Sequence, residues 1–194
     1  AVAPWMSSEV GDAWNQGYKG QGTTIIVIDD FTSGSRFGGK LGSKSETLRH
    51  GEWTLKEASM IAPSATMRSK DFGSGTAVNL SAGMNVLNLS YGMYAAAGLS
   101  ASQIGWSAQE KSIIQHAGGA ALVSKAAGND AVPVGSANSS GKVDYLNLAL
   151  KGTPSALYVG ALSTNGTVAS PARLASYSNT AGADTTVQNQ FLVV

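Results

Sequence analysis

The chain has no cysteine, only five prolines and no run of 18 or more consecutive apolar residues. Without cysteine there can be no disulfide, no thiolate zinc site and no cysteine nucleophile. Without a long apolar run we expect no membrane span within these residues. The lack of cysteine leaves the compartment open, because many secreted bacterial proteins also lack it.

The chain also lacks an excess of charge of either sign. Thirteen Lys and Arg residues balance twelve Asp and Glu residues, and the charges are scattered along the sequence. No basic stripe is present that could neutralise phosphates, so we do not expect a nucleic-acid partner. Only two histidines occur, His50 and His116, and any histidine-based mechanism must use one of them.

What the chain does have is enough apolar material for one sizeable core. With 194 residues, 43% of them apolar, it is predicted to form one soluble globular domain over residues 1–194. The opening residues, AVAPW, contain neither a charged n-region nor an apolar h-region. We therefore expect that any signal peptide or pro-segment has already been removed.

Apolar strand patterns alternate with helix patterns along the chain. Helices are expected from the Ser7 or Ser8 cap to about residue 18, near 47–59 and over 100–116, with a Gly/Ser-rich loop reaching about Ser45. A polar stretch is expected around 135–142. This alternation predicts an α/β fold of three layers, a mostly parallel sheet with helices on both faces. The expected strands are 23–28, 65–70, 84–90, 120–127, 156–160 and 191–194.

Polar residues follow several of these strands, where ligand chemistry gathers in parallel sheets. Asp29, Ser90 and Asn129 each come directly after, or soon after, an apolar run. An acid, the nearby His50 and an amide donor suggest acyl transfer. In that chemistry a carboxylate orients an imidazole base, and an amide N–H stabilises the oxyanion.

Five sequence blocks in this order resemble the subtilisin-like serine proteases. The blocks are GQGTTIIVIDD (20–30), RHGEWTLKEASMIAPSATM (49–67), GMNVLNLSYG (83–92), ALVSKAAGND (121–130) and SALYVGALSTNGTVASPARLASYSN (155–179). The resemblance covers nearly the whole chain. It implies a serine endopeptidase acting on peptide or protein substrates, secreted or at the cell surface of a bacterium.

The resemblance also implies roles for individual residues. Asp29 would be the orienting carboxylate, His50 the general base and Asn129 the side-chain donor of an oxyanion hole. Two segments would pair with an extended substrate by backbone hydrogen bonds, and a third would form a wall of the primary specificity pocket. These substrate-binding residues are Gly73, Ser74 and Gly75; Ser90, Tyr91 and Gly92; and Ala126, Ala127 and Gly128.

The chain departs from the family pattern at several places, among them a shortened segment between Gly75 and Met84 and an apparent insertion at 131–152. Glu52 and Trp53 follow His50-Gly51, where the family has Thr-His. The loop that holds a calcium ion in many members is shortened, so we do not expect that tight site. A structural calcium elsewhere stays open, and we expect no cofactor and no catalytic metal. The family's G-T-S-x-A-x-P motif, which holds the nucleophile, does not occur. We therefore expect the strand-turn-helix unit that would follow the strand at 191–194 to be missing, and with it the serine.

Three accounts of the missing serine stay open. The chain is one piece of a longer protease whose serine-bearing fragment stays associated, or a fragment that has lost the rest, or a non-catalytic peptide-binding relative. A different class, nucleotide binding, rests on GSRFGGK (34–40), which satisfies G-x-x-x-x-G-K but has Leu41 in place of Ser or Thr. His116, near a helix end, is interpreted as structural.

Overall fold

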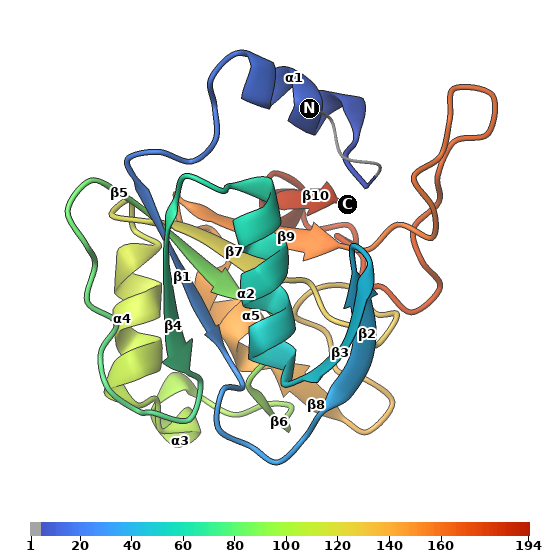
Figure 1. The fold of residues 1–194 in the computed structure, drawn as a ribbon. Helices are drawn as coiled ribbons and strands as arrows, with labels where there is room; N and C mark the ends of the chain where they lie inside the picture. Colours follow the sequence, from blue (N-terminus) through green and yellow to red (C-terminus); the bar gives the residue numbers. More distant parts are fainter. Residues whose placement is uncertain (1–4) are drawn as a thin grey trace. The chain divides into compact units, whose positions relative to one another are not determined.

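The computed structural model describes residues 5–194 and has an α/β architecture with a six-stranded parallel sheet and helices around it (Figure 1). The strand order is β10-β9-β7-β5-β1-β4. This confirms the predicted fold class. The backbone divides into two compact units, unit 1 with residues 5–74 and 80–87 and unit 2 with residues 75–79 and 88–194. That residues 1–194 form one domain stays a prediction.

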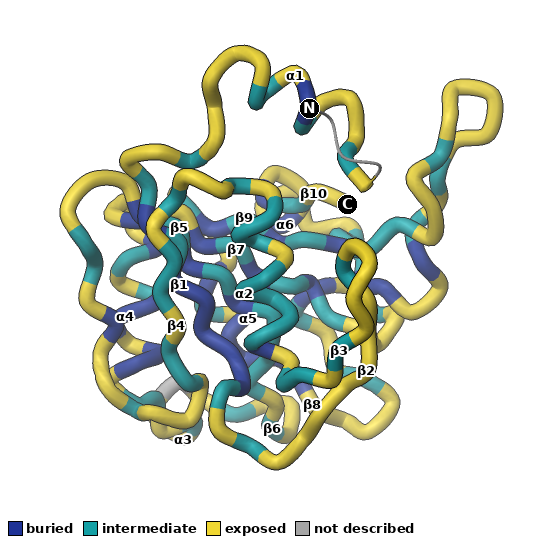
Figure 2. The backbone as a smooth tube through the Cα atoms, viewed as in Figure 1, coloured by how far each residue is buried: buried dark blue, intermediate teal, exposed yellow. Residues whose placement is uncertain are grey.

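Unit 1 is built on two parallel strands, β1 (Thr23–Asp29) and β4 (Thr66–Asp71). Helix α2 (His50–Ile61) packs against both strands. Figure 2 shows β1 as the most buried segment of this unit, and Ile26, Val27 and Ile28 are 0% exposed. A run of β-branched residues suits a strand that is covered on both faces, which is why this strand was predictable.

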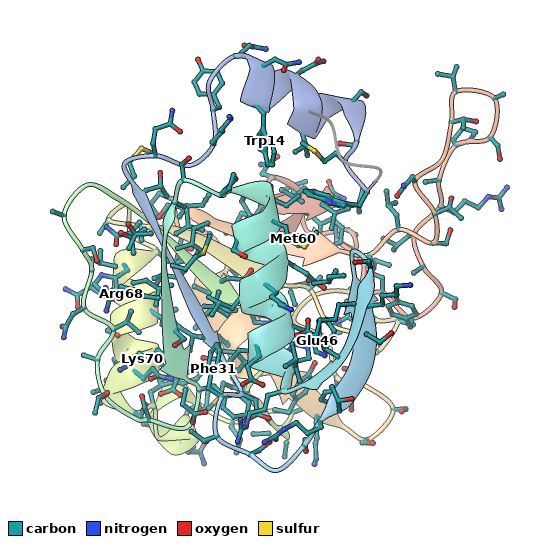
Figure 3. All side chains as sticks on the ribbon, viewed as in Figure 1. Trp14, Phe31, Glu46, Met60, Arg68 and Lys70 are labelled. Atoms are coloured by element: carbon teal, nitrogen blue, oxygen red, sulfur yellow. The ribbon has the colours of Figure 1, made fainter. Side chains whose placement is uncertain are left out.

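Helix α1 (Ser8–Asn15) begins where its cap was expected. The Ser7 side chain accepts a hydrogen bond from the backbone N–H of Val10. The helix ends three residues before the predicted end at residue 18. Trp14, on this helix, donates from its indole nitrogen to the backbone oxygen of Ile61 at 2.9 Å (Figure 3). The contact ties α1 to the end of α2.

The prediction of a Gly/Ser-rich loop that reaches Ser45 is wrong, because part of that segment belongs to an antiparallel hairpin. Strands β2 (Phe37–Leu41) and β3 (Lys44–Leu48) are joined at Gly42, whose φ of 72° suits glycine. The hairpin is mostly exposed and polar, so it shows no apolar pattern. The Gly-Ser pair between the strands was the available signal. The GSRFGGK motif runs into β2 and no helix follows it, so the phosphate-loop interpretation is also wrong.

Unit 2 is built on three parallel strands, β7 (Leu122–Ala126), β9 (Ala156–Gly160) and β10 (Phe191–Val193). Strand β5 (Met84–Leu89) contributes its last two residues to this unit. Helix α4 (Ala108–His116) packs against β7 and against α5 (Tyr145–Leu150). The expected strands at 120–127, 156–160 and 191–194 are confirmed within one or two residues at most ends.

Several short elements of unit 2 were not predicted. The helix expected over 100–116 is broken into α3 (Ala101–Ile104) and α4, because Gly105 takes φ 66° and Ser107 starts a new capping box. The other unpredicted elements are β6 (Tyr94–Ala96), which pairs with β8 (Lys142–Asp144), and α5 and α6 (Thr185–Gln188). None of the helices within residues 5–194 is long and apolar enough to cross a bilayer.

Candidate functional site

Asp29 and His50 meet in unit 1. Asp29 ends β1 and is 2% exposed, whereas His50 begins α2 and its side chain is 49% exposed. The Nδ1 atom of His50 lies 2.7 Å from Oδ1 of Asp29. The same oxygen accepts the backbone N–H of Asp30 at 2.7 Å. Residues 21 positions apart in the sequence are thus joined by one short hydrogen bond.

The close approach of α2 to the end of β1 depends on Gly51. Its backbone N–H donates to the carbonyl oxygen of Asp30 at 3.0 Å. A Cβ atom at this position would lie 2.6 Å from that oxygen and 2.9 Å from the Phe31 ring. Only glycine leaves room for the first turn of α2 beside the strand end, which sets the position of His50.

The pairing gives His50 the protonation behaviour of a base that is held in place. The hydrogen bond that His50 donates to Asp29 raises the pKa of His50, and burial opposes this rise without cancelling it. When Nδ1 donates to the carboxylate, the neutral imidazole presents Nε2 as an acceptor. Within residues 5–194, Nε2 has no hydrogen-bond partner. The half-exposed ring can therefore accept a proton from a group that arrives from outside.

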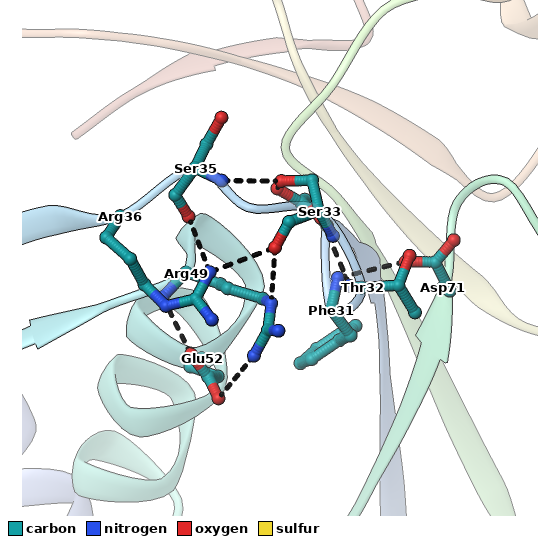
Figure 4. A network of polar contacts seen from close by, with 9 residues as sticks. Phe31, Thr32, Ser33, Ser35, Arg36, Arg49, Glu52 and Asp71 are labelled. Atoms are coloured by element: carbon teal, nitrogen blue, oxygen red, sulfur yellow. Dashed lines mark hydrogen bonds and ion pairs between the residues drawn. The ribbon is translucent and has the colours of Figure 1, made fainter.

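Glu52, one of the two departures after His50-Gly51, acts as a helix cap. Its Oε2 atom accepts the backbone N–H of Arg49 at 2.7 Å, and its Oε1 atom lies 3.6 Å from the Arg49 guanidinium (Figure 4). Arg49 in turn donates from Nε to the carbonyl oxygen of Ser33 at 2.8 Å. The carboxylate is therefore occupied at the start of α2.

Trp53, the other departure, anchors the hairpin. Its indole N–H donates to the carbonyl oxygen of Phe37 at 2.9 Å, and a Cβ at Gly39 would lie 2.8 Å from its ring. The Phe37 ring then meets the His50 ring edge-on, with 6.3 Å between centroids. Phe37 was missed by sequence reasoning, because a phenylalanine in a Gly/Ser-rich stretch carries no positional signal.

The loop after β1 and the end of β4 share a polar network in unit 1. Asp71 accepts from the backbone N–H of Phe31 and from the Thr32 hydroxyl, each at 3.0 Å (Figure 4). Its other oxygen accepts the backbone N–H of Gly73 at 2.9 Å. Gly73 and Ser74 therefore sit at a turn fixed by Asp71. Gly75, the third residue of that predicted substrate segment, belongs to unit 2.

The Gly128-Asn129 turn of unit 2 is held by the side chain of Asn179. Its Nδ2 atom donates to the carbonyl oxygen of Ala127 at 2.9 Å, and its Oδ1 atom accepts the backbone N–H of Asp130 at 3.0 Å. Gly128 has φ 114°, and a Cβ there would collide with the Asn179 amide. The exposed Asn129 thus stands on a turn that a buried asparagine fixes from both sides.

Six of the predicted residues of unit 2 line one pocket of about 490 Å³. They are Ser90, Tyr91, Gly92, Ala126, Gly128 and Asn129. Ala127, predicted as part of the same wall, is instead in the core at 0% exposure. Successive side chains of an extended segment point to opposite faces, so Ala127 does not share the wall that was predicted for it and Ala126.

A buried ion pair lies beside this pocket and was not predicted. Lys125, at 1% side-chain exposure, places Nζ 2.8 Å from Oδ2 of Asp144. Burial lowers the pKa of Lys125, and Asp144 works against that fall. A lysine within an otherwise apolar strand was the available signal, since lysine is rarely buried unless it is paired.

Other polar candidates have structural contacts. His116 lies in unit 2, where its Nε2 atom is 2.7 Å from the carbonyl oxygen of Val78. This contact agrees with the structural interpretation of His116. Among residues 5–194 there is no cluster of three His, Asp or Glu residues that could hold a metal ion. That the protein needs no metal or cofactor stays a prediction.

Comparison with known proteins supports the predicted fold class and does not support the predicted family. No family model matches the chain, and no curated protein matches it. The chain resembles a solved structure described as that of the prenylagaramide maturation protease PagA, with 17% identity and a TM-score of 0.55. The match covers 98% of this chain and 67% of that chain. Membership of the subtilisin-like family, with a missing serine segment, is therefore not supported. At this identity the likeness shows an α/β fold shared with a protease.

Proposed function

We propose that the chain supplies the base and its orienting acid to a serine peptidase. One observation carries the proposal, the 2.7 Å hydrogen bond between a buried Asp29 and a half-exposed His50. A carboxylate that holds Nδ1 fixes the tautomer in which Nε2 can take a proton from a hydroxyl. The fold shared with a maturation protease supports a peptidase over other acyl transferases.

In the proposed reaction His50 removes the proton of a serine hydroxyl as that oxygen attacks a peptide carbonyl carbon. The protonated imidazole then gives the proton to the leaving amine, and water, activated by the same base, releases the acyl group. Asp29 stabilises the imidazolium throughout. The serine would come from a segment outside residues 1–194, associated with this chain in an exported bacterial protein.

The remaining predicted residues have supporting roles in this proposal. Asn129 would donate to the oxyanion, and loss of one such donor costs about 2.7–4 kcal/mol in the transition state. Ser90, Tyr91 and Gly92 would pair with an extended peptide, as would Gly73, Ser74 and Gly75. No metal or cofactor takes part.

A fluorophosphonate probe tests the proposal on the complete gene product. We expect one serine to be labelled, with its position found by peptide mass mapping. His50→Ala should abolish labelling, and Asp29→Asn should slow it by roughly three to four orders of magnitude. The labelling rate should rise with pH as His50 loses its proton, with a midpoint above the ordinary histidine value.

His116→Gln is the matched control, because it removes the chain's other histidine and should leave labelling unchanged. A folded gene product that resists the probe at every pH would sink the proposal. If such a product still bound peptides, the chain would be a non-catalytic peptide-binding protein.

A further inference from the structure

The pocket of unit 2 borders a charged group that the proposed chemistry does not use. Lys125 belongs to β7 and lines the pocket, although its side chain is 1% exposed. Its Nζ atom donates to Oδ2 of Asp144 at 2.8 Å and to the carbonyl oxygen of Ala126 at 2.7 Å. An ammonium in this position is costly to bury, so its remaining hydrogen-bonding capacity matters.

The two partners of this ion pair differ in how well they are satisfied. Asp144 accepts the backbone N–H groups of Met93 at 3.0 Å and Leu146 at 3.1 Å in addition to the Lys125 ammonium. The ammonium has three N–H groups and two acceptors among residues 5–194. One N–H of Lys125 is left without a partner, and a buried donor in that state favours any acceptor that reaches it.

The ion pair lies against two residues that line the pocket. They are Ala126, whose carbonyl oxygen accepts from Lys125, and Gly92. A Cβ atom at Gly92 would lie 2.5 Å from Oδ2 of Asp144. The glycine therefore leaves only its backbone between the pocket and the Lys125–Asp144 pair. A ligand that packs against Gly92 and Ala126 therefore comes next to this ion pair.

The other ionisable groups of the lining balance one another in charge. Lys142 lines the pocket and is exposed, and Asp130 is the one carboxylate of the lining. Tyr94 also lines the pocket. Burial, together with Asp144 and Asp130, raises the pKa of Tyr94 to about 12, so its hydroxyl stays neutral. Lys142 and Asp130 thus offset one another, as do Lys125 and Asp144, and the third N–H of Lys125 is the feature that distinguishes this pocket.

We propose that this pocket selects a peptide side chain that ends in a carboxylate, and that Lys125 determines the selection. The inference rests on the proposed function in that the side chain belongs to a peptide substrate. The carboxylate of a glutamate or aspartate accepts the third N–H of Lys125 and meets Lys142 at the rim. An apolar side chain leaves that N–H unpaired, which penalises it more than a lost contact would.

Binding to the chain of 194 residues tests the selection without any catalysis. The probes are N-acetyl amides of glutamate, glutamine, leucine and lysine, titrated against ¹⁵N-labelled protein. We expect the glutamate probe to shift the amide signals of residues 90–92 and 126–130, with an affinity about tenfold above that of the leucine probe. Equal affinity for the four probes, or a preference for leucine or lysine, would overturn the inference.

The decisive variants remove the ammonium while keeping the fold. Lys125→Met alone leaves Asp144 buried without its cation, so the double variant Lys125→Met, Asp144→Asn is used beside it. The asparagine Oδ1 can still accept from Met93 and Leu146. In this double variant the glutamate preference should fall to about onefold. Retention of the full preference in a folded double variant would assign the selection elsewhere and refute the role of Lys125.

The variant Lys142→Gln separates the contribution of the exposed ammonium of Lys142 from that of the buried ammonium of Lys125. It should reduce the glutamate preference only about two- to threefold, because an exposed charge is screened by solvent. A loss as large as that in the double variant would show that the rim ammonium makes the selection and would refute the inference.

Cleavage by the complete gene product separates this inference from the proposed function. A peptide library varied at the residue before the scissile bond should be cut preferentially after glutamate or aspartate. Fluorophosphonate labelling with no acidic preference in either assay would leave the peptidase standing and refute the pocket inference. Glutamate-selective binding without fluorophosphonate labelling would support the pocket inference and refute the peptidase proposal.

Discussion

Unit 1 and unit 2 each hold a buried aspartate at a strand end with one basic partner, and the partners differ in exposure. Asp29 is 2% exposed and pairs with a half-exposed histidine. Asp144 is 4% exposed and pairs with a lysine that is 1% exposed. The histidine of the first pair can exchange a proton with an arriving group. In the second pair, loss of either charge would leave the other charge buried without a partner. The two carboxylates are about equally buried, so the exposure of the basic partner is what distinguishes the reactive pair from the fixed pair.

The largest effect should follow from breaking the buried pair of unit 2. Lys125→Met leaves the Asp144 carboxylate desolvated without its cation, and such changes cost about 3–5 kcal/mol of unfolding free energy. Urea unfolding followed by circular dichroism measures the loss. The double variant Lys125→Met, Asp144→Asn should recover most of it, since neither side chain is then charged. A single variant within about 0.5 kcal/mol of the wild type would show that the pair is solvated.

A second test removes the asparagine that holds the turn of unit 2. Asn179→Ala leaves the Ala127 carbonyl oxygen and the Asp130 and Val132 amides without this partner. We expect a loss of about 2–3 kcal/mol in unfolding free energy. Asn138→Ala is the control, because its Oδ1 atom caps an exposed loop at Ser140 and Lys142. Equal losses in both variants would argue against a special role of Asn179.

A third test moves the histidine of unit 1 without touching its ring. Gly51→Ala places a Cβ 2.6 Å from the Asp30 carbonyl oxygen, so α2 must shift away from β1. We expect a loss of about 1–3 kcal/mol, as in other overpacked sites, and a His50 pKa that falls toward its ordinary value. Gly34→Ala, which meets no atom within 4 Å, is the control. An unchanged His50 pKa would mean that the helix absorbs the methyl group.

The smallest effect on stability should come from Asp29→Asn, because its partner is half exposed. The pKa of His50 should fall, since the hydrogen bond that His50 donates to the Asp29 carboxylate is what raises it. In the wild type the raised pKa adds stability that is fully present below the unfolded value, near 6.5, and is lost as pH rises through the folded value. The variant should lose this pH dependence.

Proton NMR titration of His50 measures this change, with the His116 signal as the internal reference. A His50 titration that is the same in the variant and the wild type would contradict the pairing.

The sequence predicted the candidate site better in unit 1 than in unit 2. The strand that ends at Asp29 and the helix that carries His50 follow from local patterns, and the resemblance paired the two residues. Phe37 and the hairpin were not predicted, because an exposed hairpin has no apolar alternation. In unit 2 six of the twelve residues that line the pocket were predicted, and Ala127, which was predicted with them, lies in the core. Lys125 escaped because lysine in isolation indicates a surface position.

The sequence by itself determined the α/β class, the buried strands and the identity of Asp29, His50 and Asn129 as candidates, because periodicity and strand-end chemistry are local properties. The tertiary structure alone decided that Asp29 touches His50, that Asn179 holds the Gly128 turn and that Lys125 is buried against Asp144. Each of these contacts joins residues 19 to 51 positions apart. Only the folded chain brings such residues within hydrogen-bond distance, and only burial gives those hydrogen bonds and charges their strength.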